Sequence, residues 1–177
     1  MSTNTKTKTT TKATISALSN PFSTGGGGVD FEHRVQATFL LALLVESFTP
    51  LLNSPITSIR FQGKRGGNDV DDVIVESCLN THSAKLLCQI KHGVSLTKNE
   101  TFKEVLIAAW SDYNKATFNK QHDKIVLISG TVANANSLRF IHDQANAAMD
   151  SEDFVDRINR ENYSNDTNRK KLQIIRD

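Results

Sequence analysis

The sequence has little of several features that would assign a protein to a class at once. It has two cysteines in 177 residues, Cys78 and Cys88, and they form neither a CxxC pair nor a disulfide framework. The formal net charge is only +2, which excludes a histone-like polycation. The longest apolar run, residues 39–45, is far shorter than the roughly 18 residues that span a bilayer. We therefore expect a cytoplasmic protein in a reducing compartment, without contact with a membrane.

The composition is that of a folded domain with a polar tail. Hydrophobic residues make up 38% of the chain, enough to bury a core, and the length favours one domain. Residues 1–20 are predicted to be a disordered basic tail, since their first twelve positions are nearly all Ser, Thr, Asn and Lys. The folded domain is expected over residues 21–160. Residues 161–177 are expected to be a linker, or the start of a following element of a longer protein.

A glycine-rich stretch, residues 25–28, leads into the first predicted helix. Val29 and Asp30 follow it where a phosphate-binding loop would need Lys and then Ser or Thr, which excludes a Walker-type nucleotide site. Asp30 is instead the expected cap of a helix that runs to Phe48 and is buried on most sides in its second half.

Hydrophobic periodicity predicts an α/β fold with a mixed sheet flanked by helices. In a second helix, one apolar and aromatic face is expected to lie in the core, and its residues are Phe102, Val105, Leu106, Ala109, Trp110 and Tyr113. The order is helix, three strands, helix, strand, helix, and the short connection between the second and third strands predicts an antiparallel hairpin. After the first helix, the predicted strands cover 56–61, 70–76, 86–91 and 124–129, and the predicted helices cover 101–114, 134 or 136 to 149, and 153–160.

Polar residues gather where the second and third strands meet. Asp71 and Asp72 stand at the start of one strand, while Gln89 and Lys91 end its hairpin partner. Side chains at i and i+2 share a face of a strand, so Gln89 and Lys91 point together. Antiparallel pairing then brings the acidic pair beside an amide oxygen and an ammonium group. Asp72 directly precedes the apolar strand and is our first choice for the inward carboxylate, although strand parity leaves Asp71 open.

Such a group is suited to metal-assisted hydrolysis of phosphodiesters. Mg²⁺ prefers carboxylate, amide and carbonyl oxygens, and a bound Mg²⁺ polarises a phosphoryl oxygen and lowers the pKa of a bound water. A lysine beside it can orient that water or offset charge that develops on the phosphate. Glu32, early on the first helix, could add a carboxylate, directly or through water.

These residues resemble the PD-(D/E)XK superfamily of restriction-endonuclease-like nucleases, in the variant where Gln replaces the Glu of the E-x-K motif. The family core has the order αβββαβ, and the likeness covers roughly residues 29–148. More narrowly, residues 20–35 together with Asp71-Asp72 and residues 89–92 (Gln-Ile-Lys-His) look like double-stranded-DNA endonuclease effector domains of bacterial antiphage systems. Such domains occur in cyclic-oligonucleotide-activated (CBASS-type) defence and at the N-terminus of antiviral STAND NTPases.

The resemblance implies a role for each residue of the motif. One aspartate of Asp71 and Asp72 binds Mg²⁺, for which Mn²⁺ can substitute, Gln89 replaces a metal-binding carboxylate, and Lys91 is the catalytic lysine. The backbone carbonyl of Ile90 and the carboxylate of Glu32 complete the site. The implied activity is endonucleolytic cleavage of double-stranded DNA with little sequence specificity, by residues 21–160 as a nuclease domain. The implied partners are other copies of the chain, in a dimer or tetramer, and a C-terminal NTPase or sensor region.

Three weaker candidates could contact DNA. Lys64 and Arg65, flanked by glycines on a loop, could hold a phosphate, and His92 directly follows the catalytic lysine. Because Gln89 removes one negative charge from the metal site, a degenerate module that binds DNA or oligomerises without catalysis is an alternative. A modification-dependent restriction endonuclease is another, with the same chemistry and a different regulation.

Overall fold

Strands and helices follow one another along the chain in the predicted order. The computed structural model describes residues 26–49, 51–79, 82–133, 135–160 and 165–177, and the predicted tail, 1–20, lies outside them. Within the described residues the elements are α1 (Gly26–Leu44), β1 (Ile56–Phe61), the 3-10 helix η2 (Gly63–Gly66), β2 (Val73–Leu79), β3 (His82–Ser95), α2 (Glu100–Tyr113), β4 (Lys124–Ala133), α3 (Ala135–Ala147), α4 (Ser151–Asn159) and α5 (Asp166–Arg176).

The strands form one mixed sheet in the order β1-β2-β3-β4. β1, β2 and β3 pair antiparallel, whereas β3 and β4 are parallel and are connected through α2. A parallel pair needs a crossover connection of about a dozen or more residues, and α2 with its flanking loops supplies it. The predicted α/β class, with a mixed sheet flanked by helices and the order αβββαβ, is therefore confirmed.

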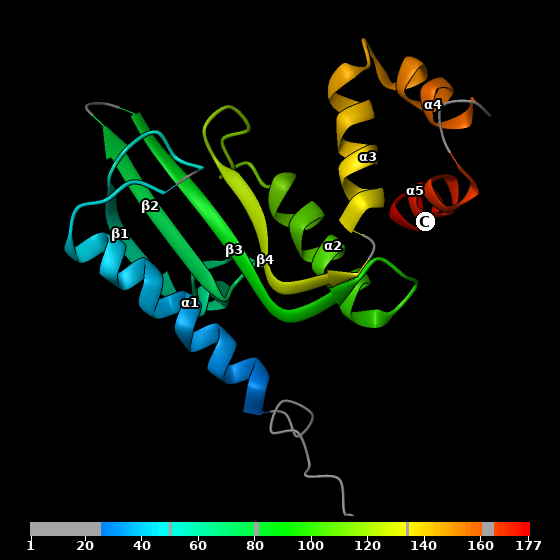
Figure 1. Cartoon of the computed structure of the whole chain (residues 1–177). Helices are drawn as coiled ribbons and strands as arrows, with labels where there is room; N and C mark the ends of the chain where they lie inside the picture. The colour runs from blue at the N-terminus through cyan, green and yellow to red at the C-terminus, as the bar shows by residue number, and fades with distance from the viewer. Residues whose placement is uncertain (1–25, 50, 80–81, 134, 161–164) are drawn as a thin grey trace, which may run out of the picture.

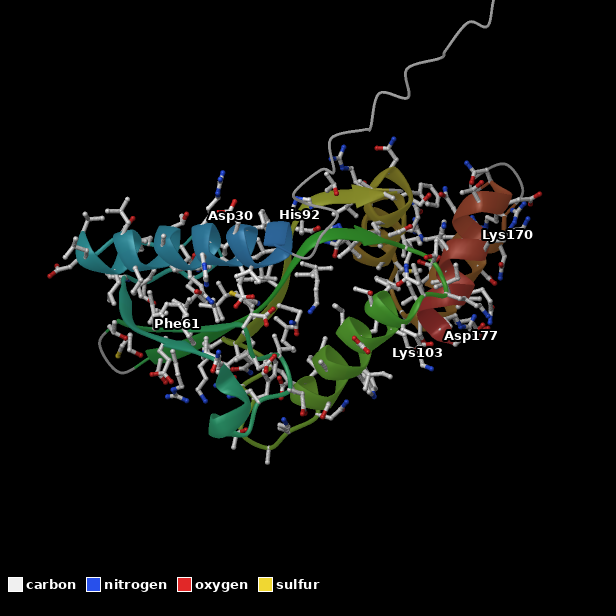
Figure 2. The ribbon with its side chains drawn as sticks, turned by 90° about the horizontal axis from the view of Figure 1, so that it is seen from below. Asp30, Phe61, His92, Lys103, Lys170 and Asp177 are labelled. Carbon is white, nitrogen blue, oxygen red and sulfur yellow. The ribbon has the colours of Figure 1, made fainter. Side chains whose placement is uncertain are left out.

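Helices cover both faces of the sheet. Figures 1 and 2 show α1 on one side of the strands and α2 on the other. Side chains alternate between these two layers because successive strand residues point to opposite faces. Val73 and Cys88 pack with residues of α1 such as Phe31, while Ile74 and Leu87 pack with residues of α2 such as Ala108. This alternation decides which polar residues of β3 can share a cleft with α2.

The C-terminal part of the chain forms a three-helix unit beyond the end of β4 (Figure 1). Ile141, Ile158 and Leu172, one from each of α3, α4 and α5, form its buried core. The segment expected as a linker or a new element, 161–177, thus contains helix α5, which packs against the rest of this unit. α5 begins at an asparagine cap, where the Asn165 side chain accepts a hydrogen bond from the backbone N–H of Asn168.

Two expectations for the helices are wrong. α1 begins at Gly26 rather than at a cap formed by Asp30, whose carboxylate instead pairs with Arg34 one turn later at 2.9 Å. It also ends at Leu44, before Phe48, and its second half is covered by the sheet on one side only, so that Leu44 is 80% exposed. None of the described helices is both long and apolar enough to cross a bilayer.

The apolar face predicted on α2 lies in the core at its start but not at its end. Trp110 is 69% exposed, and Tyr113, which stacks on it with ring centroids 6.0 Å apart, is 39% exposed. Phe102 and Val105 are buried as predicted, and Asp112 is buried with them. Trp110 lies five residues after Val105, roughly 140° around the helix, and therefore points away from the sheet.

Candidate active site

The acidic pair and the end of β3 meet as predicted. Asp72 immediately precedes β2, and its Oδ2 accepts hydrogen bonds from Gln89 Nε2 and from the backbone N–H of Ile90, each at 2.5 Å. Gln89 and Ile90 are both buried. A single carboxylate oxygen therefore joins the start of β2 to β3 at the point where the two strands separate.

The pairing register explains this contact. Val73 lies opposite Cys88, and the register continues without a break to the hairpin turn. If this register is extended by one residue before β2 begins, Asp72 comes opposite Gln89. Because the two residues of a hydrogen-bonded antiparallel pair exchange both backbone bonds, the N–H and C=O of one residue face the same neighbouring strand. The carbonyl of Ile90, like its N–H, therefore faces the Asp72 side of β3.

A cleft of about 520 Å³ opens between this junction and α2. Asp71, Gln89 and Lys91 all line it, so three of the predicted residues share one space. Lys91 is half-buried, and within the described part of the chain its ammonium group forms no ion pair. Its charge is thus available to a ligand in the cleft.

The two aspartates occupy different positions. Asp71 lines the cleft with Lys91, whereas the carboxylate of Asp72, our first choice for the inward residue, is bonded to β3. The backbone carbonyl of Asp71 accepts a hydrogen bond from the N–H of Gly63 at 2.6 Å. In this structure Asp72 joins β2 to β3, and Asp71 is the member of the acidic pair that lines the cleft.

Glu32 and His92 lie on the other side of the sheet. Glu32 is on α1, and its carboxylate accepts a hydrogen bond from Gln36 at 2.9 Å. His92 follows Lys91 in the strand and so faces the opposite layer, where its ring packs edge-on against Phe31 of α1 with centroids 5.8 Å apart. Figure 2 shows His92 beside the start of α1. The structure does not bring either residue into the cleft lined by Lys91.

For Lys64 and Arg65, the structure describes the backbone but not the side chains. Lys64 and Arg65 belong to η2, the 3-10 helix between β1 and β2. Their side chains lie outside the described residues, so their predicted phosphate contact stays a prediction.

The cleft also contains polar residues that sequence patterns did not single out. Glu104 and Ser111, from α2, and Asp69, from the segment before Asp71, complete its polar lining. Glu104 and Ser111 are seven residues apart, two helical turns, and therefore lie on one side of α2. That spacing was visible in the sequence, but nothing in it indicated that this side of α2 faces the end of β3.

The oxygen donors at the junction are of the kind that Mg²⁺ binds. The amide nitrogen of Gln89 donates a hydrogen bond to Asp72. The side-chain carbonyl oxygen of Gln89 is therefore left as an acceptor. With the Asp71 carboxylate and the Ile90 carbonyl this gives a hard, oxygen-only set. Among the described residues, however, no three His, Cys, Asp or Glu side chains are grouped closely enough to hold a metal ion by themselves.

The nearby cysteine does not add a nucleophile. Burial, and then the negative charge of Asp72, raise the pKa of the Cys88 thiol to about 12. The reactive form of cysteine is the thiolate, which is scarce at neutral pH when the pKa is this high. Cys88 is a core residue packed under α1.

No family model, no curated protein and no solved structure matches the chain. Its function is therefore inferred from the geometry of its own residues.

Proposed function

We propose that the chain is a metal-dependent endonuclease that hydrolyses phosphodiester bonds of double-stranded DNA, with Mg²⁺ as cofactor and Mn²⁺ as a substitute. The observation that carries the proposal is the meeting of Asp71, Gln89 and Lys91 in one cleft. A carboxylate, an amide and an unpaired ammonium group at the junction of two strands suit a scissile phosphate and its metal. By the resemblance to PD-(D/E)XK nuclease domains, one aspartate of the pair and Gln89 bind the metal, and Lys91 is the catalytic lysine.

Each residue has a distinct task in this proposal. Asp71 and the carbonyl oxygens of Gln89 and Ile90 would hold Mg²⁺, which supplies Lewis acidity and a water of lowered pKa. Lys91 attracts the phosphate and offsets the negative charge that develops on it. Asp72 keeps Gln89 and Ile90 in place through its two hydrogen bonds. Glu104, on the facing wall, is a further acceptor for a water in the cleft.

The cellular role follows from the resemblance alone. By it, the nuclease is the effector of a cytoplasmic bacterial antiphage protein, assembles as a dimer or tetramer when active, and works with an NTPase or sensor region. Cleavage that rises more steeply than linearly with protein concentration would support activation by self-association. A rate per molecule that is constant over a wide concentration range would contradict it.

The test is plasmid cleavage with Mg²⁺ by the parent, by Lys91→Ala and by Lys85→Ala. Lys85 is a matched control, since it is another half-buried lysine on β3, six residues away, and thus on the same face. We expect Lys91→Ala to lower the cleavage rate by roughly 10²-fold or more, because it removes a charge placed at the reacting phosphate. Lys85→Ala should cut like the parent. Equal cleavage by Lys91→Ala and the parent would refute the proposed site.

A second candidate function is a DNA-binding or oligomerising module without catalysis. Two observations favour it: Gln89 stands where a metal-binding carboxylate would be, and the described residues contain no group of three metal-binding side chains. Calorimetry separates the two, because a nuclease site should bind Mn²⁺ and lose that binding in Asp71→Asn. Absence of Mn²⁺ binding and of cleavage in the parent would favour the non-catalytic module.

A further inference from the structure

The segment that leads into the acidic pair is fastened to the last turn of α2. Asp112 is only 1% exposed, and its carboxylate accepts hydrogen bonds from the backbone N–H of Asp69 at 3.0 Å and of Val70 at 2.7 Å. These bonds join residues 42 and 43 positions apart in the sequence. A buried carboxylate is costly unless it is paired, so its position here requires compensation.

The positive charge of Lys115 compensates the buried charge of Asp112, and Lys115 also forms hydrogen bonds to the segment before Asp71. Its ammonium group donates to Asp112 Oδ1 at 2.5 Å, and to Asp69 Oδ2 and the Gly67 carbonyl at 2.7 Å each. Burial by itself would lower the pKa of Lys115, but its hydrogen bonds with Asp112 and Asp69 and their negative charges outweigh this and raise the pKa above its usual value. Ser111 donates a further hydrogen bond to Asp69 Oδ2 at 2.6 Å. Gly67, Asp69 and Val70 are therefore held by the last turn of α2 and by Lys115 just after it.

The fastened segment is covalently next to the acidic pair. Val70 immediately precedes Asp71, and two residues of chain span at most about 7 Å. On the far side of the pair, the β2–β3 ladder fixes Val73 opposite Cys88. Asp71 and Asp72 therefore lie between two positions that are held in place, the hydrogen bonds to Asp112 on one side and the Val73–Cys88 pair on the other.

We propose that Asp112 is a positioning residue for the site. It holds Asp69 and Val70 so that Asp72 meets the Ile90 N–H and Asp71 lines the cleft with Lys91. The consequence for metal binding rests on the proposed nuclease function, whereas the placement of Asp72 against β3 does not.

The test compares Asp112→Asn with a matched control, Asp123→Asn. Asp123 is also a buried carboxylate that accepts two backbone N–H bonds, from Lys85 and Asn119 at 2.8 Å each, but it lies outside the cleft. The first measurement is amide hydrogen exchange of Ile90, whose N–H donates to Asp72. The second is the Mn²⁺ concentration that gives half-maximal binding by calorimetry.

In Asp112→Asn we expect Ile90 exchange to become roughly tenfold faster and half-maximal Mn²⁺ binding to need roughly tenfold more metal, as for other residues that orient metal ligands. Asp123→Asn should leave both within about twofold of the parent. Unchanged Ile90 exchange in Asp112→Asn overturns the inference, and so does an equal increase in both variants, which would mean general loosening.

Two further arms keep the result interpretable. If Asp112→Asn does not fold, Lys115→Met decides instead, with a smaller increase in Ile90 exchange expected and an unchanged rate overturning the inference. If the parent binds no Mn²⁺ and cuts no DNA, the proposed nuclease function fails. The Ile90 exchange measurement then still decides whether Asp112 positions Asp72.

Discussion

Replacing Asp72 with alanine should destabilise the fold even though Asp72 stands in an acidic site. The substitution removes the acceptor of two hydrogen bonds and leaves the N–H of buried Ile90 without it. A hydrogen bond to a charged group contributes about 1.5–3 kcal/mol, and an unpaired buried donor costs about 1–3 kcal/mol.

An opposing effect comes from the neighbouring carboxylates. Removing the charge of Asp72 relieves its repulsion by Asp71 and Asp69, which line the cleft and are not buried. Charge pairs in such water-accessible positions contribute about 0.2–1 kcal/mol each. The loss of hydrogen bonds is therefore the larger effect, and the net loss of unfolding free energy should be about 2 kcal/mol.

Urea denaturation followed by circular dichroism, without divalent metal, measures this loss. With a slope of about 2 kcal/mol per molar urea, the midpoint of unfolding should fall by about 1 M. Glu104→Ala is the control, because it removes an exposed carboxylate from the same cleft and should change the stability by less than about 0.5 kcal/mol. An Asp72→Ala midpoint equal to that of the parent would refute the bonding of Asp72 to β3.

Two further predictions concern other parts of the chain. Trp110, the single tryptophan, should have the red-shifted fluorescence of an exposed indole and should be quenched readily by iodide. Trp110→Ser should lower the free energy of unfolding by less than about 0.5 kcal/mol. Blue-shifted emission that iodide does not quench would contradict the exposure of Trp110. A hydrogen bond from the backbone N–H of Met149, and then the bond with Arg157, lower the pKa of Asp153 below 3.8. The stabilising effect of these bonds is present above pH 3.8 and is lost as the pH falls through the lowered pKa. Asp153→Asn should therefore flatten the dependence of the thermal unfolding temperature on acid pH. An unchanged pH profile would count against these bonds.

Much of the sheet was predictable because its signals are local. Short apolar runs marked β1, β2, β3 and β4, and one short turn fixed the antiparallel hairpin that brings Asp72 to Gln89. The lengths were less predictable. β3 was expected over 86–91 but covers His82–Ser95, because its first residues pair with the end of β2 across the hairpin and its last residues pair with β4, which is distant in sequence.

The hydrophobic residues of α2 predicted its orientation only in part, since Phe102 and Val105 are buried as expected. Its large apolar residue Trp110 faces solvent, while Asp112, a residue typical of helix surfaces, is buried. The burial of Asp112 depends on two backbone N–H groups more than forty residues earlier in the chain, and no pattern within the helix reports them. For the same reason the sequence could not identify Glu104 as part of the cleft.

Helix α2 also contacts the C-terminal helices. Phe102, in its first turn, lies in the same buried cluster as Ile174 and Ile175 of α5. Asp112 lies at the opposite end of α2, and residues in the middle of α2 form a wall of the cleft. A shift of α5 that moved α2 as a rigid body would therefore also move one wall of the cleft and the hydrogen bonds that hold the segment before Asp71.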